Sequence, residues 1–209
     1  MDLVRASHLY KVFGKNERQV IERLKAGESR EELASLGTAA VIDVSFEVAK
    51  GETFVVMGLS GSGKSTLIRM INGLWSPSEG TVEVAGKVVS DMNDAQLRAL
   101  RRDHVSMVFQ HFALLPHLTV RENAAYGLKL QGKLKQKERL EKANEWLNTV
   151  GLNGWGDKYP HQLSGGMQQR VGLARALAAE TDILLMDEAF SALDPLIRRE
   201  MQDQLLELQ

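Results

Sequence analysis

A glycine-rich segment in the first third of the chain has the residue types and spacing of a phosphate-binding loop. It reads Gly58-Leu59-Ser60-Gly61-Ser62-Gly63-Lys64-Ser65-Thr66. Glycines let several backbone N–H groups converge on phosphate oxygens in conformations that a Cβ atom would forbid. The Lys64 ammonium is placed for the β- and γ-phosphates of a nucleotide, and the Ser65 hydroxyl is placed for Mg²⁺. The alternative is a tight glycine turn that binds nothing.

The segments on either side of this loop favour the phosphate-binding interpretation. An apolar, β-prone run at 53–57 precedes it, and Leu67, Ile68, Ile71 and Leu74 follow it at helical spacing. A strand before the loop and a helix after it are the context that the motif requires, and the helix N-terminus adds the positive end of its dipole. The sequence therefore predicts a strand, a nucleotide phosphate site and a helix in this order.

Two acidic residues follow a buried-type strand later in the chain. The apolar run 183–186 is typical of a parallel strand covered on both faces, and Asp187 and Glu188 come directly after it. Open α/β sheets bind ligands at the carboxyl ends of their strands. Asp187 suits the holding of Mg²⁺, and Glu188 suits general-base activation of a water molecule. Taken alone, such a pair is more often a solvated strand end.

A second small-residue segment precedes a helical pattern at 167–179. Ser164 occupies an N-cap position, and Gly165 and Gly166 leave the helix N-terminus open for an anion. One chain needs one phosphate site for each triphosphate, so a second site suggests that two copies face each other. The alternative for these three residues in isolation is an ordinary helix-start turn.

Together these motifs resemble the ATP-binding subunit of an ABC transporter, over essentially the whole chain. Gln110 matches the Q-loop, Ser191-Ala192-Leu193-Asp194 matches the D-loop, and Leu163-Ser164-Gly165-Gly166 matches the signature. Phe13 is the best match to the aromatic residue that stacks on adenine. A phenylalanine is acceptable at this position because stacking needs a ring face and not a hydroxyl group. The alternative for Phe13 is a core aromatic at a strand end.

The resemblance implies a role for each matched residue. ATP is expected at Phe13 and at residues 58–66, and Mg²⁺ at Ser65, Gln110 and Asp187. Glu188 and Gln110 are the expected catalytic residues, and Asp194 belongs to the D-loop. The remaining residues implied are those that close over the ATP of a second copy, in a head-to-tail dimer with two ATP molecules: Ser164, Gly165, Gly166 and Gln168.

The fold implied is an α/β, P-loop NTPase fold of the ABC type, with a RecA-like parallel-sheet core, an antiparallel β subdomain and a helical subdomain. Alternating patterns predict strands within 1–14 and 41–48, and 81–89 reads as a hairpin. The helical subdomain is expected over about 112–162. It contains a capping box at 119–122 and a helix from Lys135 to Val150 that Gly151 closes.

An insert at 15–40 separates Phe13 from the next strand. Its apolar spacing predicts one helix that contains Val20, Ile21 and Leu24, and a second that begins near Ser29. On physical grounds the insert is a solvated helical decoration. Its presence, with the segments around the phosphate loop and Glu188, is similar to the ATPase of glycine betaine/proline-type importers, which take up quaternary ammonium osmolytes. The solute itself does not follow from this chain.

The composition of the chain limits the kinds of partner that we expect it to bind. A net charge of −1 gives no broad electrostatic reason to bind nucleic acid. The chain has no cysteine and no apolar run long enough to span a bilayer. If it drives transport, a separate permease must form the membrane path. The resemblance therefore implies a homodimer on the cytoplasmic face of the inner membrane, bound to that permease and indirectly served by a substrate-binding protein.

The chain departs from the ABC pattern at its C-terminal end. It stops at Gln209 within an apparent helix, and none of its five histidines has the position of the family's switch histidine, beyond the acidic strand end. The sequence is therefore expected to be a single nucleotide-binding domain, 1–209, truncated at its C-terminus, and the regulatory CBS pair of this subfamily is also absent from it. We expect the isolated chain to bind ATP but to hydrolyse it weakly.

Other classes of protein fit less well. A DNA-repair ABC protein would place a long coiled coil between Gln110 and Ser164, a translation factor would carry two cassettes, and a small-molecule kinase would lack the signature. A regulatory module without catalysis would typically have lost Lys64 or Glu188. An ABC ATPase coupled to another small-molecule substrate, or to a partner outside transport, remains an alternative.

Overall fold

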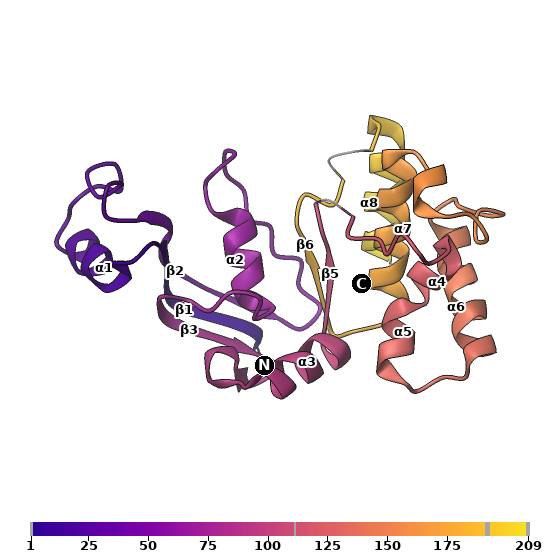
Figure 1. Cartoon of the computed structure of the whole chain (residues 1–209), viewed down its shortest axis with the longest axis horizontal. Helices are drawn as coiled ribbons and strands as arrows, with labels where there is room; N and C mark the ends of the chain where they lie inside the picture. Colours follow the sequence, from indigo (N-terminus) through magenta and orange to yellow (C-terminus); the bar gives the residue numbers. More distant parts are fainter. Residues whose placement is uncertain (1, 111, 191–192, 208–209) are drawn as a thin grey trace. The chain divides into compact units, whose positions relative to one another are not determined.

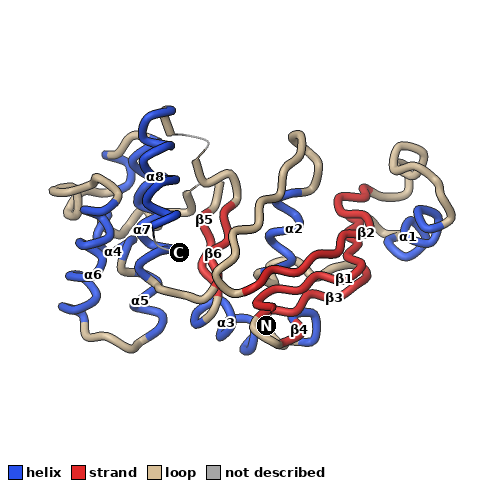
Figure 2. Tube along the Cα trace, turned by 180° about the vertical axis from the view of Figure 1, so that it is seen from behind, coloured by secondary structure: helices blue, strands red, loops and turns tan. Residues whose placement is uncertain are grey.

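The computed structural model describes residues 2–110, 112–190 and 193–207, which form two compact units, Met1–Arg98 and Ala99–Gln209 (Figures 1 and 2). The first contains β1 (Asp2–Phe13), α1 (Glu17–Lys25), β2 (Thr38–Ala49), α2 (Lys64–Ile71), β3 (Glu79–Val84), β4 (Lys87–Val88), the 3₁₀ turn η1 (Val89–Asp91) and the start of α3 (Asp94–Asp103). The second contains β5 (Val105–Val108), α4 (Val120–Ala124), α5 (Tyr126–Gln131), α6 (Gln136–Thr149), the 3₁₀ turn η2 (Pro160–Gln162), α7 (Gly165–Ala178), β6 (Ile183–Met186) and α8 (Pro195–Glu207).

The first unit is built on an antiparallel sheet with strand order β2-β1-β3-β4 (Figure 2). Strand β1 is central and pairs with β2 and β3 on its two sides. The predicted hairpin is confirmed: Ala85 and Gly86 join β3 to β4 with φ values of 50° and 73°. Positive φ at both turn residues is the two-residue geometry that matches the twist of the strands. The antiparallel β subdomain expected from the alternating pattern is therefore present.

The insert forms its predicted first helix, but the prediction of a second helix is wrong. Helix α1 buries Val20 and Ile21 beside Leu33, with Tyr10 and Val12 of β1 in the same core cluster. Residues 30–36 are a series of turns, whose backbone bonds have a mixture of three- and four-residue spacings before β2 begins. The Glu32 carboxylate accepts from the N–H and the hydroxyl of Ser29, but the backbone bonds that follow do not keep the four-residue spacing of an α-helix. The insert is also more than a solvated decoration, because its apolar residues share a buried cluster with β1.

The strand predicted at 53–57 is not present in the structure. These residues have no regular secondary structure and are exposed, with Val55 at 69% and Met57 at 87%. A strand is held by hydrogen bonds to a neighbouring strand, and the sheet of the first unit is made of β1 to β4. Apolar, β-prone composition is not sufficient without such a neighbour. The helix predicted after the phosphate loop is confirmed as α2, although Leu74 lies beyond its end and is exposed.

The second unit combines a parallel strand pair with a cluster of helices. Strands β5 and β6 pair in parallel, from Val105 opposite Ile183 to Val108 opposite Met186. Helices α4, α6 and α7 pack around a buried apolar cluster, with α5 beside them (Figure 1). The capping box at Thr119 and Glu122 is confirmed. Gly151, with φ 70°, lies just beyond the C-terminal end of α6, as predicted. The Thr119 N–H and hydroxyl lower the pKa of the Glu122 carboxyl by hydrogen bonding to its charged form.

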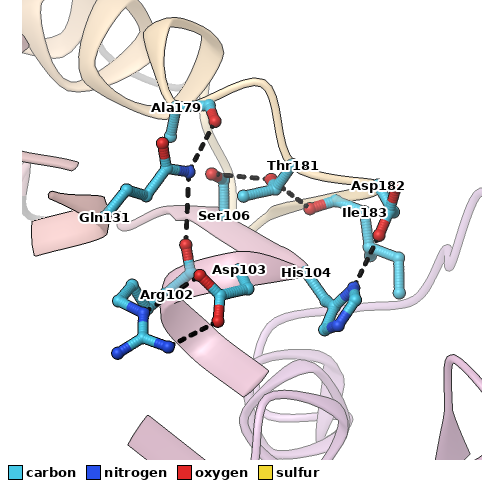
Figure 3. A network of polar contacts seen from close by, with 9 residues as sticks. All are labelled: Arg102, Asp103, His104, Ser106, Gln131, Ala179, Thr181, Asp182 and Ile183. Atoms are coloured by element: carbon cyan, nitrogen blue, oxygen red, sulfur yellow. Dashed lines mark hydrogen bonds and ion pairs between the residues drawn. The ribbon is translucent and has the colours of Figure 1, made fainter. Parts of the chain in front are cut away.

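Polar contacts join the starting ends of β5 and β6 to the neighbouring helices (Figure 3). The Gln131 amide at the end of α5 donates to the Ala179 carbonyl at 2.8 Å and to the Arg102 carbonyl at 3.3 Å. The His104 Nδ1 atom lies 2.7 Å from the Asp182 Oδ2 atom. These contacts fix the amino ends of the two strands. The functional side chains come from the opposite, carboxyl ends.

Candidate functional site

The phosphate loop is folded into a glycine-dependent turn at the start of α2. Gly63 is its N-cap, with φ 91°, and a Cβ atom there would lie 2.1 Å from the Ala40 carbonyl oxygen. Such a contact is impossible without moving β2, so glycine is required at this position. The Lys64 Nζ atom donates to the Gly58 and Leu59 carbonyl oxygens, each at 2.9 Å. The lysine ammonium is thus held at the loop, at the positive end of the α2 dipole, where an anion would be stabilised.

The predicted adenine-stacking residue, Phe13, lies at the end of β1. Its side chain is 38% exposed, which contradicts the alternative of a core aromatic. The Trp75 ring meets it edge-on at a centroid distance of 5.0 Å, and the Arg69 guanidinium of α2 lies 4.9 Å from the Trp75 ring centroid. An edge-to-face contact leaves ring surface for stacking. Trp75, which orients Phe13, was not singled out by the sequence patterns.

The parallel pairing of β5 and β6 brings Gln110 and the acidic pair to one edge. The Asp187 N–H donates to the Val108 carbonyl at 3.0 Å, and its side chain is 1% exposed. Glu188 is exposed and has φ 51°, an uncommon conformation for a residue with a Cβ atom. The Gln110 Nε2 atom donates to the Glu188 Oε2 atom at 2.9 Å. A carboxylate that accepts one such bond still has lone pairs to accept a proton from water.

The predicted signature residues form an open helix N-terminus on α7. The Ser164 Oγ atom accepts from the Met167 N–H at 3.3 Å, which confirms the N-cap. Ser164 and Gly165 are exposed, and a Cβ atom placed on Gly165 would meet nothing within 4 Å. Gln168 donates instead to the Pro160 and Leu163 carbonyl oxygens of the preceding turn. Its amide shapes the signature loop, and contact with a nucleotide stays a prediction.

Gln169 is a residue of the site that sequence reasoning missed. It is 1% exposed, and its Nε2 atom lies 3.5 Å from the backbone carbonyl oxygen of Glu188, at the limit of a hydrogen bond. The signal available in the sequence was a second glutamine directly after Gln168. Helical periodicity places the two side chains on different faces, and the apolar neighbours of Gln169 indicate the buried one.

The predicted D-loop is described in part. Ser191 and Ala192 lie outside the described residues, whereas Leu193 is buried. The Asp194 Oδ1 atom accepts from the N–H groups of Leu196 and Ile197, both at 3.1 Å. Asp194 therefore caps the first turn of α8, and a further role towards a nucleotide stays a prediction.

The residues predicted for Mg²⁺ offer donor chemistry that fits the ion. Ser65 supplies a hydroxyl oxygen, Gln110 an amide oxygen and Asp187 a carboxylate, and Mg²⁺ prefers hard oxygen ligands. Among the described residues no group of three or more His, Cys, Asp or Glu side chains could hold a metal.

Comparison with known proteins identifies relatives over most of the chain. The chain is 55% identical over 207 residues to the glycine betaine transport ATP-binding protein OpuAA of Bacillus subtilis, covering 98% of this chain and 49% of the relative. It is 53% identical over 212 residues to the glycine betaine/carnitine transport ATP-binding protein GbuA of Listeria monocytogenes, covering 100% and 53%. The chain thus spans about half the length of the curated relatives it matches.

The fold and the family agree with these relatives. A solved dimer of an ATP-binding cassette in a post-hydrolysis state, bound to ADP and Pi, superposes with a TM-score of 0.85 at 33% identity, over 98% of this chain and 82% of that one. In the described part of the chain, no helix is both long and apolar enough to cross a membrane. The family model described as ABC transporter matches residues 41–191. The motifs, the fold and this match together show that the chain belongs to the ABC transporter family, whose cassettes bind ATP.

Proposed function

We propose that this chain binds and hydrolyses ATP to drive a membrane importer of quaternary ammonium solutes such as glycine betaine. The observation that carries the ATPase activity is the Gln110–Glu188 hydrogen bond beside the buried Asp187, at the carboxyl edge of a parallel strand pair. The solute class is supported by similarity to the glycine betaine relatives.

In this proposal, residues 58–66 bind the phosphates of ATP and Phe13 stacks on adenine. The backbone N–H groups of the glycine-rich loop bind phosphate oxygens, and Lys64 exchanges its carbonyl partners for phosphate oxygens. Ser65, Gln110 and Asp187 would hold Mg²⁺. When bound, this ion neutralises charge on the phosphates and so lowers the barrier to their cleavage.

Glu188 acts as the general base in the hydrolytic step. Its carboxylate accepts a proton from the water that attacks the γ-phosphorus, and the bond to ADP breaks. Gln110 orients this carboxylate through the bond to Oε2. Gln169 steadies the Glu188 backbone, which has positive φ. A base held in one orientation reacts faster because no free energy is spent on ordering it in the transition state.

The proposed active form is a head-to-tail homodimer with two ATP molecules. Ser164, Gly165 and Gly166, with Gln168 shaping their loop, lie at an exposed helix N-terminus that suits the γ-phosphate of ATP on a second copy. Asp194 of the D-loop would lie near the same interface. The solved cassette that this chain resembles is a dimer.

Coupling to transport requires a membrane permease subunit, which a substrate-binding protein would supply with solute. We place the chain at the cytoplasmic face of the inner membrane, as one nucleotide-binding domain over 1–209 with a helical insert at 15–40 and a helical subdomain at about 112–162. The net charge of −1 supports no role with nucleic acid. The second candidate is an ABC ATPase for another small-molecule substrate, because the chain is also 53% identical over 156 residues to the methionine import ATP-binding protein MetN of Bacillus subtilis.

A complementation experiment tests the two-copy site in the assembled transporter. Ser164→Arg places bulk and positive charge at the anion site and should spare ATP binding but block closure. Lys64→Ala removes the phosphate-binding ammonium. Each variant alone should lose most ATP hydrolysis. When the two variants are coassembled one to one, about half of the dimers are mixed, and one of the two sites in each mixed dimer combines an intact phosphate loop with an intact signature. About a quarter of all sites should therefore recover ATP hydrolysis.

The control is Asn153→Arg, which adds the same side chain at another exposed position of the second unit. It should hydrolyse ATP like the wild type. Failure of the mixture to exceed either variant alone would show that the signature does not act on the ATP of another copy. Full activity of Ser164→Arg by itself would show the same.

A further inference from the structure

Two consecutive residues just beyond Gln110 have a left-handed backbone. Phe112 has φ 56° and Ala113 has φ 47°. Residues with a Cβ atom adopt this region rarely, and two in succession are unfavourable unless the surroundings hold them. The segment that leads away from Gln110 therefore depends on contacts from another element.

Those contacts come from one side chain of α7. The Arg175 Nη1 atom donates to the Ala113 carbonyl oxygen at 2.7 Å, and its Nη2 atom donates to the Phe112 carbonyl oxygen at 2.9 Å. The planar guanidinium thus reaches the two successive carbonyl groups with two separate nitrogen atoms held in a fixed plane, whereas a lysine ammonium has a single nitrogen to share between them. Gly172, about one turn earlier on α7, lies beside the bend, since a Cβ atom built there would be in ordinary van der Waals contact with the Phe112 carbonyl oxygen, at 3.5 Å.

Arg175 is placed there at an energetic cost. The residue is half-buried, and burial lowers the pKa of its guanidinium. Both hydrogen-bond acceptors named above are neutral carbonyl groups. A partly desolvated cation whose contacts go to backbone carbonyls is a poor contributor to stability, since an apolar residue would fill the same space without desolvation. This arrangement suggests that Arg175 serves the conformation of the bend.

The bend bears directly on the catalytic contact. Gln110 donates to the Glu188 carboxylate, and Gln169 of α7 reaches the Glu188 backbone carbonyl. Two side chains of α7, Gln169 and Arg175, therefore hold the two sides of the Gln110–Glu188 bond. The same helix begins at the signature residues, so a shift of α7 would be transmitted to this bond.

We propose that Arg175 is a positioning residue for ATP hydrolysis, which clamps the Phe112–Ala113 bend and so holds the Gln110 amide on Glu188. This inference rests on the proposed ATPase function. Arg175 acts through Gln110, and its loss should slow the hydrolytic step while leaving ATP binding by the phosphate loop unchanged.

The test is a double-mutant cycle on the assembled transporter. Arg175→Met keeps a long unbranched side chain and removes the guanidinium that donates to the two carbonyl groups. We expect kcat for ATP hydrolysis to fall by about tenfold to a hundredfold, as for a small misplacement of a reacting group, with the KM for ATP within about twofold of wild type. In a Gln110→Ala background, Arg175→Met should cause no further fall in kcat. Arg175→Lys, which replaces two donor nitrogens by one, should have a kcat between those of the wild type and Arg175→Met.

Two further variants separate positioning from a general loss of structure. Arg139→Met removes another guanidinium that donates to a backbone carbonyl, that of Leu134, in the helical part of the same unit. It should leave kcat unchanged. Ala113→Gly removes the Cβ atom that disfavours positive φ, so it should restore part of the kcat of Arg175→Met.

ATP hydrolysis by the wild type, and its loss in Glu188→Gln, are measured first. If either is not observed, the proposed ATPase function fails, independently of the clamp. The clamp is then contradicted by any of three results: equal fractional losses in the wild-type and Gln110→Ala backgrounds, a loss in Arg139→Met equal to that in Arg175→Met, or a rise in KM with unchanged kcat. If Arg175→Met does not fold, the same cycle is run with Arg175→Lys, which keeps the charge and most of the volume.

Discussion

Replacing Glu188 by glutamine is expected to stop ATP hydrolysis while ATP remains bound. The amide has nearly the same shape as the carboxylate, and its oxygen can still accept the hydrogen bond from Gln110 that the Glu188 Oε2 atom accepts at 2.9 Å. What is lost is the base, because an amide does not take up a proton from water near neutral pH. Removing a positioned general base lowers kcat by about a hundredfold to ten-thousandfold.

The measurement is phosphate release by the assembled transporter, together with the amount of ATP retained by the protein. Glu145→Gln, an exposed glutamate of α6, is the matched control and should behave like the wild type. Hydrolysis by Glu188→Gln within about threefold of wild type would remove Glu188 from the role of base, since a positioned base contributes far more. Loss of bound ATP in the same variant would instead indicate a structural defect.

Replacing Lys64 by alanine has the second large effect, on ATP binding. The Lys64 ammonium holds the Gly58 and Leu59 carbonyl oxygens, so it orders the loop even without nucleotide. With ATP it would contact charged phosphate oxygens. Losing charge-assisted hydrogen bonds of this kind should raise the Kd for ATP by about tenfold to a hundredfold, and hydrolysis should fall at least as much.

Isothermal titration with ATP and Mg²⁺ gives this Kd directly. Lys87→Ala, at an exposed lysine of β4 in the same unit, is the control and should leave the Kd unchanged. An unchanged Kd in Lys64→Ala would show that the glycine-rich loop does not bind the phosphates of ATP.

The parts of the site that were predictable from the sequence are those with local causes. Ser164 as N-cap and the Thr119–Glu122 capping box each depend on a few neighbouring residues. Gln110 and Glu188 were assigned to the same site by the resemblance alone, and their direct hydrogen bond follows from the parallel pairing of β5 and β6, which was not predicted.

The parts that could not be predicted depend on contacts between distant segments. Arg175 interrupts an apolar helical run in the sequence, and only the fold shows that its guanidinium reaches the Phe112 and Ala113 carbonyls. Trp75, in the segment between α2 and β3, meets the Phe13 ring by an edge-on contact that no spacing rule reports. The wrong prediction of a strand at 53–57 has the same origin, since strand formation depends on a neighbour and not on composition alone.

Solute accumulation by intact cells tests the central claim most directly. Cells of the source organism that carry either the intact gene or Lys64→Ala are given labelled glycine betaine, proline betaine, choline, carnitine and trimethylamine oxide, with Lys87→Ala as control. The proposed function predicts that Lys64→Ala abolishes accumulation of at least one of these solutes and that Lys87→Ala does not. Equal accumulation of every solute in all three strains would contradict a role in importing quaternary ammonium compounds or their amine oxide analogue. The ATPase would then have to serve another substrate or partner.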